Sequence, residues 1–204
     1  MKEDTRPIKY FIICVLINAL VPGLLSNIVK NQDIIDVLNI IITIISNLIL
    51  AILLFILYKN KLKEDYKNID LKKIIITVIS AIIIIVVGGL ISGLLIKSGI
   101  KMQNEESVNE GLLKLQIPMM IYVALIVPFN EEFVFRYSLG SIKSKTLFLI
   151  LTTVLFGIVH STKIDFIVFA FYGLCLGIIY LKTNKNVLVT IAIHILNNFL
   201  SMIL

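Results

Sequence analysis

The chain has 204 residues, of which 58% are hydrophobic and 16% charged, and its mean hydropathy is +1.00. This composition excludes a soluble globular protein, because apolar runs long enough for a bilayer-crossing helix, roughly 20 residues each, recur throughout the sequence. The net charge of +6 does not indicate nucleic-acid binding. The lysines instead gather in short loops beside the apolar runs, where the positive-inside rule explains them.

The apolar runs predict an all-α fold, a polytopic transmembrane helical bundle of about seven spans, with an active site in a cavity between helices. In chain order the predicted spans are 8–29, 35–58, 74–97, 115–140, 146–161, 165–181 and 187–204. We expect one membrane domain over 1–204. Within it, the N-terminal spans of residues 1–114 carry no motif, and residues 115–204 form a catalytic core.

The distribution of basic residues predicts a cytoplasmic N-terminus, because most of them fall in segments that would then face inward. The acidic segment 98–114 is expected to form a short helix at the outer surface. Two G-x-x-x-G pairs, Gly89/Gly93 and Gly173/Gly177, favour close packing within the bundle, with dimerisation as the alternative.

The fourth span carries adjacent carboxylates within a strongly apolar segment. Glu132 and Arg136 are four residues apart and share a helix face, whereas Glu131 is rotated by about 100° and points elsewhere. A carboxylate in an apolar cavity beside a second carboxylate is suited to general-base chemistry near neutral pH. Pro128 removes a backbone hydrogen bond and should kink or loosen the helix here. The alternative interpretation is a helix-end charge cluster at the cytoplasmic surface.

The chain has two histidines, and both lie in apolar spans. Phe156 and His160 share a face of the fifth span, and His194 and Asn198 share a face of the seventh, next to Asn197. Each pair alone fits a hydrogen bond between helices. Polar pairs on three separate spans are explained together by one shared cavity, because ionisable groups inside a membrane usually face one another or water.

These residues limit the chemistry. The sequence has no H-E-x-x-H and no G-x-S-x-G, so the common zinc-protease helix and serine-hydrolase elbow are absent. We favour a metal-free scheme in which Glu131, helped by His160, takes a proton from water, while His194 and Asn198 donate to an oxyanion. A zinc site formed by Glu131, His160 and His194 is the alternative cofactor prediction, because two His and one Glu match a catalytic zinc set.

Three ordered motifs resemble those of the CAAX protease and bacteriocin-processing family of intramembrane endopeptidases, also called the Abi family. They are Glu131-Glu132-x-x-x-Arg136, Phe156-x-x-x-His160 and His194-x-x-x-Asn198. The resemblance covers roughly residues 115 to 204. It implies peptide-bond hydrolysis in which Glu131 and His160 activate water, His194 and Asn198 form the oxyanion hole, and Glu132 and Arg136 position them.

The resulting prediction is an intramembrane endopeptidase acting on a membrane-associated peptide or protein, in the lipid bilayer of a bacterial plasma membrane and with no nucleic-acid partner. A non-proteolytic scaffold or bacteriocin self-immunity protein is the alternative, and it would usually lack one or more motif residues. A proton-coupled transporter is a third possibility, because buried Glu and His can form a relay. It would show repeated halves with broken helices, which the sequence lacks.

Overall fold

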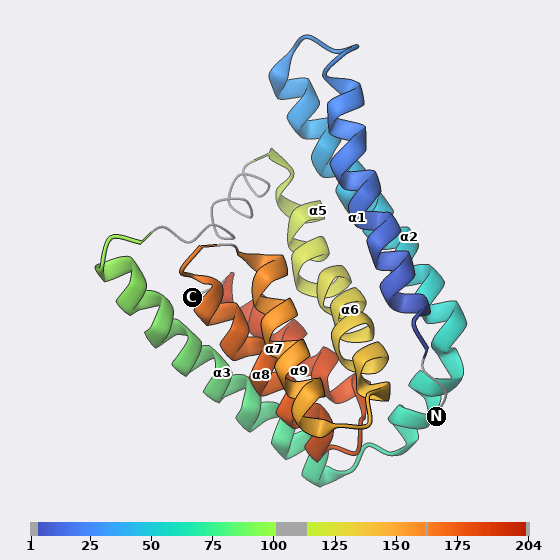
Figure 1. The fold of residues 1–204 in the computed structure, drawn as a ribbon, viewed down its shortest axis with the longest axis vertical. Coiled ribbons are helices and arrows are strands. Elements are labelled where there is room, and N and C mark those ends of the chain that lie inside the picture. Colours follow the sequence, from blue (N-terminus) through green and yellow to red (C-terminus); the bar gives the residue numbers. More distant parts are fainter. Residues whose placement is uncertain (1–3, 101–113, 162, 203–204) are drawn as a thin grey trace.

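The computed structural model describes residues 4–100, 114–161 and 163–202 (Figure 1). Within these residues the chain is all helical, with no strand, which confirms the predicted fold class. The helices are α1 (Arg6–Leu25), α2 (Gln32–Lys67), α3 (Leu71–Lys97), a continuous stretch from α5 to η3 (Gln116–Ser141), α7 (Lys145–His160), α8 (Phe166–Lys182) and α9 (Val187–Ser201). The stretch α5–η3 comprises α5 (Gln116–Ile121), η1 (Tyr122–Ile126), α6 (Val127–Glu132), η2 (Phe133–Ser138) and η3 (Leu139–Ser141).

Every predicted span coincides with one of these helices, but their lengths differ. Among the described residues, four helices are long and apolar enough to cross a membrane: α1, α2, α3 and α5–η3. The helices α7, α8 and α9 have 16, 17 and 15 residues, fewer than the roughly 20 that crossing requires. They are short because polar residues interrupt the apolar sequence between α7 and α8 and between α8 and α9, among them Ser161 and Asp165 in the first connection and Asn184 in the second.

The helix α5–η3 lies between the antiparallel hairpin α1–α2 and the group α7–α9, and α3 flanks that group on its far side (Figure 1). One buried apolar cluster joins α1 and α2 to η2, α7, α8 and α9, through residues such as Cys14, Leu54, Phe133 and Val187. A second cluster joins α3 to α8 and α9 through Ile84 and other side chains. The N-terminal helices thus flank the motif-bearing helices on two sides.

Short polar connections set the helix starts. The side chains of Asn31, Asp70, Ser144 and Asn186 each accept a hydrogen bond from a backbone N–H in the first turn of the helix that follows. Such caps satisfy donors that have no partner within the helix. The outer faces of α1, α2 and α3 expose many Ile, Leu and Val side chains, as expected for helices that contact lipid.

The two glycine pairs behave differently. A Cβ at Gly173 would lie 2.8 Å from the carbonyl oxygen of Thr152, and one at Gly177 would lie 2.7 Å from the Thr152 Cγ2 atom. This pair therefore allows α8 to approach α7 closely, as predicted. For Gly89 and Gly93, no described atom lies within 4 Å of the added Cβ, so packing within the bundle does not explain them. The segment 101–113, which holds most of the predicted surface helix, lies outside the described residues.

Candidate active site between the helices

The helix that carries the two glutamates is irregular on both sides of them. The π-helical segments η1 and η2 flank α6, and Pro128 lies in the first turn of α6. In η1 the N–H of Val127 bonds to the carbonyl of Tyr122, five residues back. Single π-helical turns of this kind often occur at functional sites. The irregularity predicted around Pro128 is therefore present, in the form of π turns.

The same irregularity explains the position of Asn198. If the five-residue pattern continued, the carbonyl of Val123 would pair with residue 128, but proline has no N–H to donate. The Asn198 amide fills the gap, donating from Nδ2 to the Val123 oxygen at 2.9 Å. Asn198 thus ties α9 to η1, and its role as an oxyanion donor stays a prediction.

This geometry predicts that Asn198 and Pro128 are energetically coupled. We expect Asn198→Leu to lower the free energy of unfolding by about 1 kcal/mol, the net value of one hydrogen bond. In a Pro128→Ala background the loss should be smaller, because the new N–H can satisfy Val123. A double-mutant cycle from unfolding in detergent measures the difference. Equal losses in both backgrounds would show that Asn198 does not compensate for Pro128.

Glu131, His160 and His194 come together although they lie on three separate helices. The Nε2 atom of His160 lies 3.5 Å from Oε1 of Glu131, and the Nε2 atom of His194 lies 3.9 Å from Oε2 of the same carboxylate. A single water can therefore contact both Glu131 and His160 at normal hydrogen-bond lengths of about 2.8 Å. The predicted proximity of these two side chains is confirmed, and the alternative of a surface charge cluster does not fit groups so buried.

Both imidazole rings are oriented through their other nitrogen. The Nδ1 atom of His160 lies 2.8 Å from the carbonyl oxygen of Phe156, and Nδ1 of His194 lies 2.9 Å from Oε1 of Glu132. A carbonyl or an ionised carboxylate can only accept, so both Nδ1 atoms donate. In a neutral imidazole only one nitrogen carries a proton. When the rings are neutral, the two Nε2 atoms that face Glu131 are therefore hydrogen-bond acceptors.

Glu132 and Arg136 form the predicted pair in the interior of the bundle. Nε of Arg136 lies 3.2 Å from Oε2 of Glu132, and both side chains are 0% exposed. The guanidinium carbon lies 4.7 Å from the centre of the Phe156 ring, a cation–π contact. Among the described residues, its Nη atoms have no hydrogen-bond partner. The Glu132 carboxylate therefore pairs with the buried Arg136 guanidinium through Oε2 and accepts from His194 through Oε1.

The sequence motifs identify one aromatic neighbour of His160, Phe156, but the structure shows two. Phe156 stacks on one side of the ring with centroids 4.3 Å apart, and Phe169 of α8 stacks with centroids 4.9 Å apart. Phe169 lies in a uniformly apolar helix, so no local pattern distinguishes it. Asn197, predicted as a supporting residue, is buried beside a small pocket next to His194, and its Oδ1 has no partner in the described structure.

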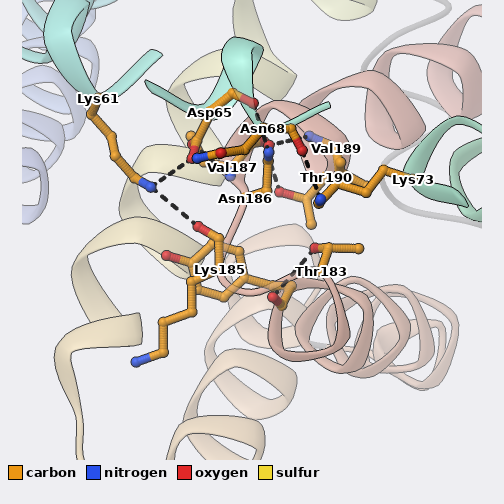
Figure 2. Close-up of polar contacts among 11 residues, drawn as sticks. Lys61, Asp65, Asn68, Lys73, Thr183, Lys185, Asn186, Val187, Val189 and Thr190 are labelled. Atoms are coloured by element: carbon orange, nitrogen blue, oxygen red, sulfur yellow. Dashed lines mark hydrogen bonds and ion pairs between the residues drawn. The ribbon is translucent and has the colours of Figure 1, made fainter. Parts of the chain in front are cut away.

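A polar anchor outside the motifs holds the start of α9 (Figure 2). Asp65 of α2 is buried, accepts from the Lys61 ammonium at 2.6 Å and from the backbone N–H of Val187 at 3.0 Å. The Asn186 amide donates to the backbone oxygen of Asp65, and Lys61 also reaches the carbonyl of Lys185. Since His194 lies two helical turns beyond Val187, this anchor fixes its depth relative to α2.

We expect Asp65→Ala to lower the free energy of unfolding by about 2 kcal/mol, because it leaves a buried N–H and an ammonium without their charged acceptor. The exposed neighbour Glu64 provides a matched control, and Glu64→Ala should change stability little. Unfolding of both variants in detergent, monitored by circular dichroism, tests this. Equal effects of the two substitutions would mean that the anchor does not stabilise the protein.

A cavity of about 160 Å³ opens beside Glu131. Its walls come from α1, α2, η1 and α6, and they include the polar side chains Asn18, Asn47, Tyr122 and Asn130. The N-terminal helices α1 and α2, which carry no motif, therefore supply about half of the residues that line the cavity beside Glu131.

The described residues do not include three His, Cys, Asp or Glu side chains arranged to hold a metal ion. The residues of the zinc alternative, Glu131, His160 and His194, are close together, but as placed they do not form a ready metal site. Both the metal-free scheme and the zinc alternative stay predictions.

The fold and the cluster together define an integral membrane protein of several helices with a carboxylate and two imidazoles enclosed between them. Comparison with known proteins agrees. A model of the Type II CAAX prenyl endopeptidase Rce1-like family matches residues 113–200. The UPF0177 protein YxdF of Lactococcus lactis subsp. lactis (strain IL1403) is 31% identical over an alignment of 119 residues, and this alignment covers 56% of this chain and 67% of that protein. No solved structure matches the chain.

The chain belongs to the CAAX protease and bacteriocin-processing family, as its motifs predicted. Its function is accordingly of the CAAX-type intramembrane protease kind, that of a peptide hydrolase. The matched segment contains all three motifs and begins close to the predicted boundary of the catalytic core.

Proposed function

We propose that the protein is an intramembrane endopeptidase of the glutamic type, which hydrolyses a peptide bond in a membrane-associated peptide or protein. The observation that carries this proposal is the Glu131 carboxylate, which lies within 3.9 Å of both imidazole Nε2 atoms and lines a cavity wide enough for water. This is the arrangement that a positioned general base requires.

In the proposed reaction Glu131 takes a proton from a water molecule whose oxygen attacks the scissile carbonyl carbon. The Nε2 atom of His160 accepts the second hydrogen of this water and so orients it. The carbonyl oxygen becomes the oxyanion of a tetrahedral intermediate. When the carbon–nitrogen bond breaks, the proton on Glu131 passes to the departing amine, which restores the carboxylate.

His194 can donate to the oxyanion through Nε2 only when both of its ring nitrogens are protonated, and Glu132 is then its counter-ion at 2.9 Å. Asn198 would have to exchange its bond to Val123 for one to the oxyanion. Once both changes have occurred, the two groups would act as oxyanion donors, which contribute strongly to acyl-transfer catalysis.

The proposed setting is a bacterial plasma membrane with the N-terminus in the cytoplasm. The start of α1, the end of α2, η3 and the α8–α9 turn all lie at the same end of the bundle (Figure 1). At this end the Lys61 ammonium donates to the backbone carbonyl of Lys185, and the Lys185 ammonium donates to the backbone carbonyl of Gly140. A basic end of this kind faces the cytoplasm by the positive-inside rule.

The test is a comparison of protein termini in membranes that contain either the wild-type protein or Glu131→Ala. New termini that arise with the wild type and not with the variant would identify the substrate and support the proposal. Identical termini in both membranes, with both proteins folded and equally abundant, would favour a scaffold or immunity role instead.

We further expect activity on that substrate to survive chelation, because the proposed scheme assigns every proton transfer to side chains. Treatment with EDTA or 1,10-phenanthroline, followed by elemental analysis of the treated protein, measures this. Stoichiometric zinc whose removal ends activity, and whose return restores it, would replace the metal-free scheme by the Glu131, His160, His194 alternative.

A further inference from the structure

The cavity beside Glu131 contains more carboxamide groups than an apolar packing defect would. Asn18 of α1, Asn47 of α2 and Asn130 of α6 all line it. Asn47 and Asn130 are buried, and the Nδ2 atom of Asn130 donates to the backbone oxygen of Asn47 at 2.9 Å. Carboxamides from three helices therefore surround the space directly in front of the proposed general base.

Two buried acceptors in this wall are unpaired. Within the described structure, Oδ1 of Asn130 and Oε2 of Glu131 have no hydrogen-bond partner, and these residues are 1% and 6% exposed. Leaving a buried acceptor without a donor costs free energy. An acyl chain in this cavity would leave both acceptors unpaired, so the wall does not suit lipid.

One donor in the same wall has only a weak partner. The Nδ2 atom of Asn18 is 3.9 Å from the thiol sulfur of Cys14, and a thiol is a poor acceptor. The cavity thus offers an acceptor at Asn130 and a donor at Asn18. An amide carries both an N–H and a C=O, so a single amide group has the donor and the acceptor that this wall calls for.

We propose that this cavity is a substrate subsite that binds an amide group beside the scissile bond. The amide N–H donates to Oδ1 of Asn130, and the amide oxygen accepts from Nδ2 of Asn18. The amide belongs either to an Asn or Gln side chain of the substrate or to its backbone. The identity of the ligand as substrate rests on the proposed function, and Asn18 and Asn130 are then specificity-determining residues.

Cys14 lines the same cavity and serves as a reporter that needs no turnover. The experiment uses Cys175→Ala protein in nanodiscs and follows the alkylation of Cys14 by N-methylmaleimide with mass spectrometry. The probes are N-acetyl-Leu-Gln-N-methylamide and N-acetyl-Leu-Leu-N-methylamide, which differ in the side-chain amide. We expect the glutamine probe to slow alkylation about fivefold, the effect of one net hydrogen bond.

Two variants test the assignment of residues. Protection should be lost in Asn130→Leu and in Asn18→Leu, and the second variant preserves the bond between Asn130 and Asn47. Asn60→Leu, an exposed position on α2, is the matched control and should keep full protection. Thermal unfolding of each variant shows that it is folded before alkylation is measured.

Each outcome decides the proposal. Equal protection by both probes that disappears in the two variants supports the subsite and assigns the amide to the backbone. Protection that persists in both variants, absence of protection by either probe, or a Cys14 that never reacts would overturn it. Because the measured quantity is alkylation of Cys14 and not cleavage of a peptide bond, this result is independent of the comparison between wild type and Glu131→Ala.

Discussion

Glu131→Gln is expected to lower kcat by about 10²- to 10⁴-fold, the range that a positioned general base contributes. The amide has nearly the same shape as the carboxylate but cannot accept a proton from water. The fold should stay intact, because Glu131 has no ion pair with a lysine or arginine within the described structure. Initial rates on the substrate identified from membranes, together with thermal unfolding, separate the two effects.

Glu64→Gln is the matched control, since this carboxylate is exposed on α2, and its kcat should equal that of the wild type. A Glu131→Gln protein that cleaves the substrate at nearly the wild-type rate would show that another group is the base. A loss of activity accompanied by unfolding would contradict the purely chemical role assigned to Glu131.

The positions of the helices and the central cluster could be predicted from the sequence. Long apolar runs have few alternatives to helices in a bilayer, because every backbone polar group must be satisfied internally. The spacing of four residues between Glu132 and Arg136 also places both side chains on one helix face, and the structure shows the pair. Proximity of Glu131 and His160 followed from the cost of leaving ionisable groups apart in hydrocarbon.

Other features of the site depend on packing between distant segments, which no local pattern reveals. A single Asn in an apolar span, such as Asn18 or Asn47, gives no indication that it will line a cavity beside Glu131. Asp65 lies in a charged stretch that is typical of an exposed helix end. In the structure it is buried and accepts from the Val187 N–H at the start of α9. Pro128 predicts an irregular helix, but no local pattern identifies the group that compensates for its missing N–H. The structure shows that this group is the Asn198 amide of α9.

Glu132→Ala is expected to lower the free energy of unfolding by about 3 to 5 kcal/mol, the typical cost of removing one partner from a buried ion pair. Arg136 would keep a charge at 0% exposure without its paired carboxylate, and the rings of Phe156 and Phe135 beside it compensate only in part. His194 would also lose the acceptor for Nδ1 that orients its ring. Folded yield and unfolding in detergent measure the loss.

The double variant Glu132→Gln, Arg136→Met separates the two roles of Glu132. Replacing both charges with neutral groups of similar volume removes the penalty of the unpaired cation, so most of the stability should return. The glutamine oxygen can still accept from Nδ1 of His194 and keep the ring in place. A Glu132→Ala protein as stable as the wild type, or a double variant no more stable than Glu132→Ala, would show that the unpaired charge of Arg136 is not what destabilises the bundle.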